Sequence, residues 1–479
     1  MVLDHSLANL ASRFPSRIAV LREDGSVSFA ALESRVLRLA GWLWRQGLRA
    51  GDMAGLSVGD AGNHLAACLA LIRIGCHQVA LPSHEPEGMR LALAARCRVG
   101  CVIGADAGCV PPGLSGLVPA FDEIFSDSAL EKVAPVPSGP EPFVFLPSSG
   151  TTGRCKIVRR TPGQLVGYGL SDLPEPSVIL GPASIESNVG KWSHLANLAR
   201  GRTLVFGSGS GVSLAEACRR HGVTLVNLAP SGAAALLGEA GSEHSCPAFG
   251  GIRFSVGGAP VSGPLRREIQ RRLTPHLFVL YGATECGNAT CAGPEQHDAH
   301  PDSAGYPLPG VEVEVVDDAG RPLPPGETGW VRIRSRVSAT GYFDDEEASA
   351  MAFRDGWFHP GDMGRMTPDG VLLFCGRGDD MMVLNTINIF PAEIEAVAES
   401  FPGVRDCAAF ALPSAAYGDI PVLALVAETG CDVHALLAHC RGQLGTRAPR
   451  TIFQVDSVPR NAAGKVVRRE LRALFESRR

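Results

Sequence analysis

The chain has 479 residues, more than one ordinary hydrophobic core accommodates, so two or three domains are expected. Its 45% apolar and 19% charged residues are typical of a folded globular protein and exclude a disordered or fibrous chain. The net charge of −5 argues against a protein that binds nucleic acid or a membrane surface.

The N-terminal segment MVLDHSLANLASRFP has no apolar stretch of signal-peptide length, and no later run reaches transmembrane length. The fourteen cysteines are scattered through apolar runs, without a CxxC pair or a His spacing typical of zinc sites. We therefore expect a cytoplasmic protein with reduced, buried thiols and no membrane span.

The first half of the chain alternates helical and strand patterns. FAALESRVLRLAGWLWRQGL places apolar residues at helical spacing and ends at Gly47, and NHLAACLALIRIGC is a second helix with an apolar face. Short apolar runs predict strands between such helices: RAGDMAGLSV, HQVALP, RTLVFG, VTLVNLAP, IRFSVGG and HLFVLYG. This alternation predicts a layered α/β architecture with largely parallel sheets.

From about residue 305 the pattern changes. VEVEVVDDAGRPLPPGETGWVRIRS predicts paired strands, and after FCGRGDD come a helix, PAEIEAVAESFPGV, two apolar runs and a final helix. We therefore predict an α/β protein with two domains. The large N-terminal domain, 1–378, has layered sheets and helices plus a β-rich module, and the small, mobile C-terminal domain, 379–479, is α+β.

One loop has a composition suited to many negative oxygens. Its hydroxyl side chains can donate hydrogen bonds, its glycines allow backbone amides to approach a ligand closely, and a lysine follows them. These residues are Ser148, Ser149, Gly150, Thr151, Thr152, Gly153 and Lys156. The Walker pattern GxxxxGK[ST] is absent, and a polar surface loop is the alternative interpretation. Taken alone, the loop leaves phosphate binding and that alternative open.

Five further motifs follow this loop in order: VGGAP, YGATE, GWFHPGDMG, GRGDD and PRNAAGK. Together the six motifs closely resemble the signature series of the adenylate-forming superfamily, which contains acyl-CoA synthetases, adenylation domains of peptide synthetases and luciferases. The resemblance covers nearly the whole chain, because VSFAALESRVLRLAGWLWRQGLRAGD also resembles the opening of that superfamily. It implies a ligase that uses ATP and Mg²⁺ to convert a small carboxylic acid into an acyl-adenylate, with release of pyrophosphate.

The resemblance also implies roles for single residues. In YGATE, Tyr281 would lie against adenine beside Gly282, Thr284 would contact the α-phosphate, and Glu285 would bind Mg²⁺ through a ligand type that this ion prefers. Lys156 would hold the β- and γ-phosphates with the 148–153 loop. Other implied nucleotide contacts are those of Gly257, Gly258 and Ala259 with adenine and of Asp362 and Arg377 with the ribose.

Two residues of the C-terminal part have implied roles in the catalytic cycle. Asp379 matches the hinge between the large and small domains, which rotate between two half-reactions. Lys465 matches the lysine that offsets repulsion between the substrate carboxylate and the α-phosphate. Because Lys156, Glu285, Asp362 and Lys465 are intact, a catalyst is favoured over a non-catalytic nucleotide-binding homologue.

The chain departs from the superfamily in the loop after the hinge. It has DDMMVLNTINIFPAEIE where relatives read close to DDMIKVGGxxIxPxEIE, so Val383 replaces a common lysine, and Asn385 and Thr386 replace a glycine pair. Because Thr386 adds a β-branched side chain where a pantetheine arm would pass, an amine acceptor such as an amino acid is favoured, as in amide synthetases of the coronafacate-ligase type. CoA or the thiol of a carrier protein is the alternative acceptor.

The region that resembles the acid pocket is also unusual. GPASIESNVGKW stands where relatives often have PxFHxxG. The Glu186 carboxylate could hold a substrate ammonium, bind a hydroxyl or cap a helix, and we favour an acid without an amino group. Five residues are expected to border the acid: Glu186, Asn188, Asn227, Ser255 and Cys286.

Overall fold

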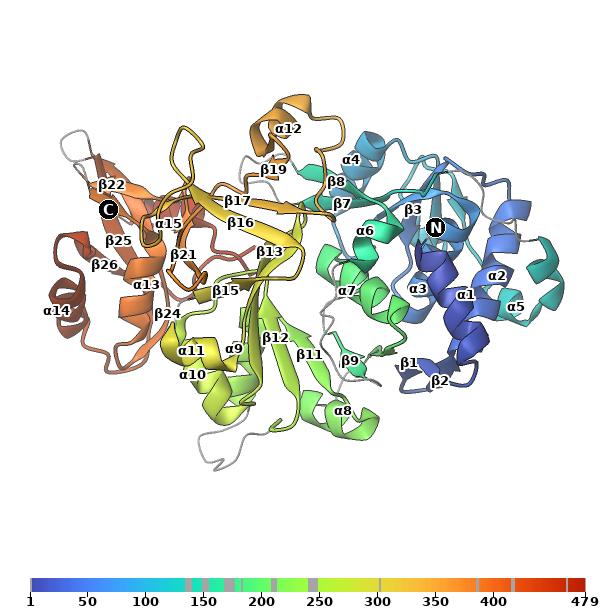
Figure 1. Ribbon diagram of the computed structural model, residues 1–479, viewed down its shortest axis with the longest axis horizontal. Coiled ribbons are helices and arrows are strands. Elements are labelled where there is room, and N and C mark those ends of the chain that lie inside the picture. The colour runs from blue at the N-terminus through green and yellow to red at the C-terminus, as the bar shows by residue number, and fades with distance from the viewer. Residues whose placement is uncertain are drawn as a thin grey trace. The chain divides into compact units, whose positions relative to one another are not determined.

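The structure is a computed structural model, and it describes the chain except residues 1, 134–139, 149–154, 168–176, 182–183, 208–212, 240–248, 301–302, 385–386, 415–417, 462–463 and 479. The chain forms two compact units (Figure 1). Unit 1 contains Met1–Asn227, Thr284–Gly287 and Arg336–Phe353, and unit 2 contains Leu228–Ala283, Asn288–Ser335 and Arg354–Arg479.

Unit 1 contains a six-stranded sheet with the strand order β6-β5-β3-β4-β7-β8. Its strands are β3 (Met53–Ser57), β4 (His77–Ala80), β5 (Cys101–Gly104), β6 (Gly116–Leu117), β7 (Val144–Ser148) and β8 (Lys156–Arg160). All neighbours are parallel except β7 and β8, in which Ser148 pairs with Lys156. The helices α3 (Ala61–Ile74) and α4 (Glu87–Cys97) connect β3 to β4 and β4 to β5. Their apolar side chains pack on the sheet, as the alternating sequence pattern predicts.

A second set of strands in unit 1 is also mostly parallel. β1 (Ile18–Arg22) pairs with β10 (Thr203–Val205), which pairs with β9 (Val178–Leu180), and β9 pairs with β11 (Leu225–Leu228). β2 (Gly25–Ser28) is antiparallel to β1. The helices of this unit are α1 (Val2–Arg13), α2 (Phe29–Arg45), α5 (Phe121–Ser126), α6 (Pro162–Val166), α7 (Asn188–Ala199), α8 (Leu214–His221) and α12 (Glu346–Ala352). Ser187 caps α7 by accepting a hydrogen bond from Gly190 N, which fixes where this helix begins.

Unit 2 begins with a parallel strand pair and continues into the β-rich module. β12 (Arg253–Gly257) is parallel to β13 (Leu277–Ala283), and α9 (Pro230–Glu239) and α10 (Gly263–Arg272) accompany them. The module is antiparallel, with β16 (Val311–Val316) paired to β17 (Gly329–Ser335) and β20 (Asp362–Met366) paired to β21 (Leu372–Arg377). Smaller elements complete it: β14 (Gly287–Ala292), α11 (Pro294–Ala299), β15 (Ser303–Pro307), β18 (Phe353–Arg354) and β19 (Trp357–Phe358).

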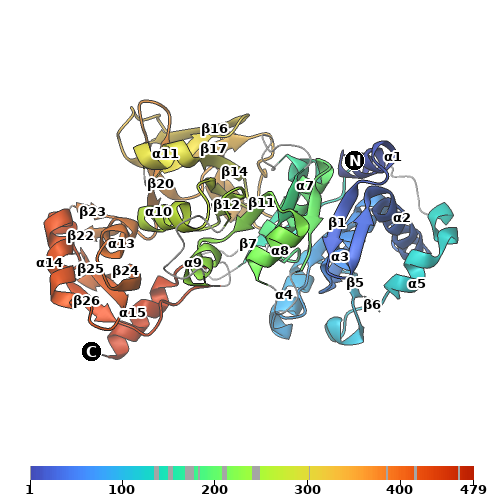
Figure 2. The same cartoon turned by 90° about the horizontal axis from the view of Figure 1, so that it is seen from below.

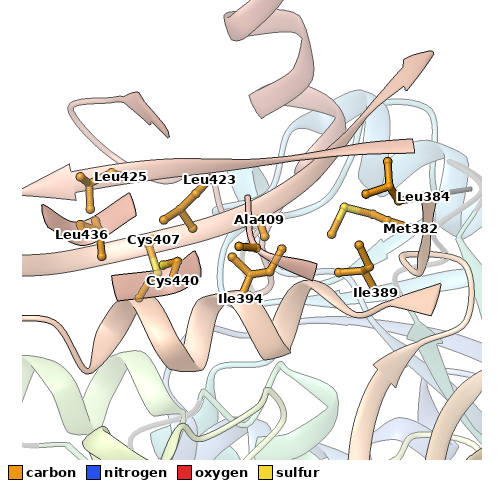
Figure 3. Packing of buried hydrophobic residues seen from close by; sticks show 12 residues of the cluster. Met382, Leu384, Ile389, Ile394, Cys407, Ala409, Leu423, Leu425, Leu436 and Cys440 are labelled. Atoms are coloured by element: carbon orange, nitrogen blue, oxygen red, sulfur yellow. The ribbon is translucent and has the colours of Figure 1, made fainter. Parts of the chain in front are cut away.

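The segment after Arg377 has a core of its own. Its elements are β22 (Met382–Leu384), β23 (Ile387–Ile389), α13 (Pro391–Glu399), β24 (Val404–Ser414), β25 (Gly418–Ala427), α14 (Val433–Leu444), β26 (Thr451–Gln454) and α15 (Arg468–Ser477). Figure 2 shows the three helices gathered around these strands. Cys407 and Ala409 of β24 pack with Ile394 and Leu436 on one face of the sheet, as Figure 3 shows. Ala408 and Phe410 pack on the other face in a separate cluster.

The predicted α/β fold, with a large N-terminal part and a small C-terminal domain, is confirmed. The predicted strand pair in VEVEVVDDAGRPLPPGETGWVRIRS is present as β16 and β17, with Val313 opposite Ile333. Sequence reasoning missed α14 and β26, which lie between the apolar run PVLALVAE and the final helix. Within the part of the chain that the structure describes, no helix is both long and apolar enough to cross a membrane.

Candidate functional site

The loop of hydroxyl and glycine residues connects two paired strands. Ser148 ends β7 and Lys156 begins β8, and these two residues are cross-strand partners. The predicted residues between them, Ser149, Gly150, Thr151, Thr152 and Gly153, lie outside the described residues. Both ends of the loop are therefore fixed by the antiparallel pairing of β7 and β8.

Within unit 1, Lys156 and Glu285 meet the same tyrosine. The Lys156 Nζ atom lies 4.9 Å from the centroid of the Tyr342 ring. The Tyr342 hydroxyl donates a hydrogen bond of 2.9 Å to Glu285 Oε1. Both Glu285 and Tyr342 are buried. The predicted phosphate-binding lysine and the predicted metal-binding carboxylate are thus held by one aromatic side chain that sequence reasoning missed.

Backbone contacts fix this cluster. Tyr342 forms a bridge with Val158 of β8, and Phe343 N donates to Ile157 O at 2.7 Å. The Glu285 carbonyl accepts from Ala339 N at 2.8 Å. Thr284 presents its carbonyl to Arg160 Nη2 at 2.8 Å, so its neighbourhood is also tied to β8. The segment 339–343 therefore aligns residues from two distant motifs.

The Glu285 carboxylate is suited to a metal ion. Its described contacts include a phenol but no ion pair with a lysine, arginine or histidine. In the described residues there is also no group of three or more histidine, cysteine or acidic side chains that would form an all-protein metal site. Mg²⁺ is commonly held by one or two carboxylates together with substrate phosphates and water, so the donor set at Glu285 fits this ion.

In unit 2, Asp362 lies opposite Arg377 in the pairing of β20 and β21. Arg377 Nη1 donates to Asp362 Oδ1 at 3.1 Å, and the Tyr281 hydroxyl donates to Asp362 Oδ2 at 2.6 Å. Burial raises the pKa of Asp362, and the Arg377 charge and the Tyr281 hydrogen bond oppose that effect. Gly361 has a φ of +77°, which suits glycine, and a side chain there would crowd the Arg377 guanidinium.

The predicted hinge residue Asp379 joins this network. Arg377 Nε donates to Asp379 Oδ1 at 3.0 Å. Burial acts to raise the pKa of Asp379, but the Arg377 hydrogen bond and charge outweigh it and the pKa is lowered. The charge of Lys465 also favours the ionised forms of Asp362 and Asp379. The structure therefore brings Tyr281, Asp362, Arg377 and Asp379 together and places Lys465 within their electrostatic reach.

Lys465 lies in a tight turn before α15. Its backbone N–H donates to Asn461 Oδ1 at 2.9 Å, and Gly464 N donates to the Asn461 carbonyl at 2.8 Å. Arg460 and Val466 form a bridge around this turn. The frame PRNAAGK thus sets the backbone direction at the lysine.

The first glycine of VGGAP lies close to the backbone of the neighbouring strand, which the sequence did not reveal. A side chain at Gly257 would place its Cβ 2.9 Å from the Leu280 carbonyl oxygen, so the strand pair of β12 and β13 itself requires a glycine there. Gly258 has a φ of +88° and open space around its Cβ position. Ala259 follows directly, before α10. The expected approach of these residues and of Gly282 to adenine stays a prediction.

The expected acid-pocket residues divide between the units. Glu186 and Asn188 lie at the start of α7, and Asn188 Nδ2 donates to Pro147 O at 2.5 Å. Asn227 Nδ2 donates to Ser193 Oγ of α7 at 3.2 Å. Cys286 is buried next to Glu285 in unit 1. Ser255 belongs to unit 2, where its hydroxyl is buried without a hydrogen-bond partner among the described residues.

Comparison with known proteins identifies the family. Residues 7–343 match the AMP-binding enzyme family, and residues 393–465 match the C-terminal domain of AMP-binding enzymes. The chain therefore belongs to the AMP-binding enzyme family. It is an AMP-forming ligase that makes an acyl-adenylate, with ATP as its nucleotide substrate.

The similar proteins include enzymes with different acceptors. The chain is 27% identical to a 2-succinylbenzoate–CoA ligase of Bacillus velezensis over 98% of this chain and 97% of that protein. A solved o-succinylbenzoate CoA synthetase of Bacillus subtilis, in complex with ATP and a magnesium ion, has a TM-score of 0.84 at 25% identity, with 98% and 99% covered. The amide bond synthetase McbA of Marinactinospora thermotolerans has a TM-score of 0.86 at 25% identity, with 99% and 100% covered.

Proposed function

We propose that this chain activates a carboxylic acid as its acyl-adenylate and then transfers the acyl group to a pantetheine thiol, on CoA or on a carrier protein. In the first step the substrate carboxylate attacks the α-phosphate of ATP, and pyrophosphate leaves. In the second step the thiol sulfur gives its proton to water and attacks the acyl carbon, and AMP leaves with the electron pair of the broken bond between that carbon and the phosphate oxygen. This assignment makes the chain a two-step ligase.

The observation that best supports the first step is that two buried carboxylates, Glu285 and Asp362, have different partners. Glu285 keeps its negative charge free of a described protein cation and fits Mg²⁺, which would neutralise phosphate charge when bound. Asp362 is already paired with Arg377 and would accept hydrogen bonds from the ribose hydroxyls. Lys156 would hold the departing phosphates, with Ser148 at the start of the same loop.

Lys465 would offset the repulsion between the attacking carboxylate and the α-phosphate. An ammonium placed there acts on charge that develops in the transition state, which is where electrostatic stabilisation increases the rate most. Tyr281 and Thr284 would orient adenine and the α-phosphate, as the motif YGATE implies. Asp379 would serve as the hinge between domains 1–378 and 379–479, a boundary that agrees with the separate core of the C-terminal segment.

The thiol is ranked first because the 2-succinylbenzoate–CoA ligase, which by its name uses CoA, resembles this chain along nearly its whole length. An amine is the second candidate acceptor. Two observations favour it: Asn385 and Thr386 replace the glycine pair in the loop after the hinge, and the chain has a fold similar to that of an amide bond synthetase. Both acceptors attack the same adenylate, so they share every residue assigned to the first step.

One competition experiment decides between the acceptors. The enzyme, Mg·ATP and a panel of aliphatic, cyclic and aryl acids are supplied with CoA and a pool of amino acids together, and the products are analysed by mass spectrometry. We expect an acyl-CoA; an amide product would instead identify an amide synthetase. The matched variant Lys465→Ala should lower pyrophosphate release by about 100-fold or more while ATP binding persists. Unchanged release would remove Lys465 from the mechanism.

A further inference from the structure

Four buried polar side chains outside the nucleotide motifs gather in unit 1. They are His64 of α3, Arg90 of α4, Glu186 just before α7 and Lys191 on the first turn of α7. Each is less than one-tenth exposed, and Lys191 is 1% exposed. Sequence reasoning selected Glu186 only, because the four come from three distant segments. None has a role in the reaction steps assigned above.

Lys191 forms no ion pair with a carboxylate among the described residues. His64 Nδ1 lies 3.0 Å from the Val58 carbonyl, so this nitrogen carries the proton and His64 Nε2 accepts a hydrogen bond from Lys191 Nζ at 3.0 Å. No other hydrogen bond and no ion pair of Lys191 occurs among the described residues. Burial lowers the pKa of Lys191 and holds the pKa of His64 well below its usual value, so the imidazole is neutral. An ammonium in this place keeps unused donors in a buried setting.

Arg90 and Glu186, the other two members, also have polar atoms without a described hydrogen-bond partner. Arg90 Nη2 donates to Ser57 Oγ at 2.9 Å and to the Cys109 carbonyl, both neutral, and its Nε has no described partner. Glu186 Oε2 lies 3.7 Å from His84 Nδ1, while its Oε1 is buried without a hydrogen bond. Burial raises the pKa of Glu186, and the charges of His84, Lys191 and Arg90 oppose that effect. Among the described residues, Glu186 is the one carboxylate whose charge acts on Lys191.

The charges of the described members do not balance when Lys191 is protonated. Lys191 and Arg90 are then two buried cations, whereas Glu186 is one buried anion. A buried charge without a partner destabilises the folded protein, so such a group is normally paired or held for a ligand. One additional carboxylate would balance the cluster and would accept the unused Lys191 hydrogen-bond donors.

The cluster lies where the topology of the sheet favours a ligand. The chain leaves β3 towards β4 and leaves β5 in the opposite direction towards β6, so the connections diverge at the neighbouring strands β3 and β5. Ser57 is the last residue of β3, Cys109 follows the carboxyl end of β5, and Arg90 donates to both. Asn188 ties the start of α7 to Pro147 of β7, next to Ser148. In open α/β sheets, ligands bind outside the carboxyl ends of the strands at such a divergence.

We propose that Lys191, oriented by His64 and supported by the charge of Arg90, binds a second carboxylate on the acid substrate, so that the enzyme activates a dicarboxylic acid. This inference rests on the proposed function, because it concerns the acid that is adenylated. Lys191 is thereby a residue that determines substrate specificity, and His64 is a positioning residue for its ammonium.

The test compares each diacid with a partner that lacks only the second charge. ATP–pyrophosphate exchange is measured with succinic, glutaric, adipic and phthalic acids, with their monomethyl esters and with matched monocarboxylic acids. Wild-type enzyme should favour at least one diacid over its ester by about tenfold or more in kcat/KM. The same diacid should raise the Tm without ATP, and its ester should not.

Two variants separate recognition from packing. Lys191→Met should reduce the diacid-to-ester ratio to near one and leave the Tm equal to or above that of the wild type, because an unpaired buried cation is removed. The control Arg73→Met removes a buried cation of α3 that is paired with Glu33 at 2.8 Å, and it should lower the Tm with the acid preference unchanged. Glu186→Gln, a second probe, should strengthen diacid binding by removing a competing anion.

The outcomes are distinct. Equal activity with diacids and esters, or a Lys191→Met enzyme that keeps the diacid preference, would overturn the inference. Preference for a hydroxy acid such as 4-hydroxybutyric acid would also overturn it, since a hydroxyl bridging Lys191 and Glu186 would then be the recognised group. If no acid supports exchange, the proposed function fails, and the Tm shift of wild-type protein with diacid still decides the inference.

Discussion

Glu285 of unit 1 and Asp362 of unit 2 are both 8% exposed, and each accepts a hydrogen bond from a tyrosine hydroxyl. Their surroundings differ in charge. Arg377 contacts Asp362 directly, whereas the described contacts of Glu285 include no ion pair. A carboxylate that is already neutralised serves as a hydrogen-bond acceptor, and one that keeps its charge attracts a cation. Two equally buried carboxylates can therefore have different functions. Whether a protein cation lies beside the carboxylate determines which function it has.

The largest effect should come from Glu285→Gln. The amide keeps the shape but loses the charge that we assign to Mg²⁺, so acid-dependent ATP–pyrophosphate exchange should fall by about 100-fold or more. In a titration with Mg²⁺, the Mg²⁺ concentration needed for half-maximal activity should rise. Exposed Glu347 of α12 provides the control Glu347→Gln, which should leave both values unchanged. A Glu285→Gln enzyme with normal Mg²⁺ dependence would contradict the metal role.

The next largest effect should come from Asp362→Asn. Loss of one charged acceptor should raise the KM for ATP between about tenfold and a hundredfold, with the Mg²⁺ dependence unchanged. Asp369 is an exposed carboxylate that also accepts from a tyrosine, Tyr306, at 3.0 Å, so Asp369→Asn is the matched control. A shift in Mg²⁺ dependence for Asp362→Asn would contradict the assignment of different functions to Glu285 and Asp362.

A smaller effect is expected for Tyr342→Phe. The variant keeps the ring beside Lys156 but removes the hydroxyl that orients Glu285, so the Mg²⁺ concentration for half-maximal activity should rise by roughly fivefold. Kinetics at varied Mg²⁺ will measure this shift, and Tyr306→Phe serves as the control. An unchanged Mg²⁺ requirement would show that backbone contacts alone position Glu285.

The smallest effect concerns stability and a buried group without any charged partner. His194 donates through Nδ1 to the Gly190 carbonyl, its Nε2 is buried without a described partner, and burial lowers its pKa from 6.5 to about 4. Because the unfolded chain binds a proton first on acidification, the stabilising contribution of neutral His194 is complete above pH 6.5 and is lost as the pH falls towards 4. Buried His64 acts in the same direction.

Differential scanning calorimetry across this pH range provides the measurement. The Tm of wild-type protein should fall on acidification, and the Tm of His194→Gln should fall less, because the buried imidazole of residue 194 no longer titrates. Exposed His434 gives the control His434→Gln. Equal pH profiles for wild type and His194→Gln would exclude His194 as a source of the acid sensitivity.

The sequence predicted the layers of the fold because apolar spacing and turn residues are local signals. The helix of FAALESRVLRLAGWLWRQGL is present as α2, and its apolar face is buried. Motif order likewise selected Asp362, Arg377 and Tyr281, which the structure brings together. The Tyr342 contact was not predictable, since it depends on how residue 342 pairs with Val158, far away in the chain.

The His64–Lys191 pair shows the same limit more strongly. Each residue lies in an ordinary apolar-faced helical pattern, and 127 positions separate them. Single-sequence patterns specify which residues form a helix and which side is buried, but they do not specify which buried side chains of two helices meet. Asn385 and Thr386, from which the sequence analysis favoured an amine acceptor, lie outside the described residues.

The closed core of the C-terminal segment has an evolutionary consequence. Its sheet is covered on both faces by side chains from the segment itself. Ile394, Leu436 and Cys440 lie on one face (Figure 3), and Phe410 and Leu471 lie on the other. Substitutions in this core are therefore absorbed locally and leave the packing around α3 and α7 intact. We therefore expect that this segment can be exchanged between relatives as a module without disturbing the cores of the rest of the chain.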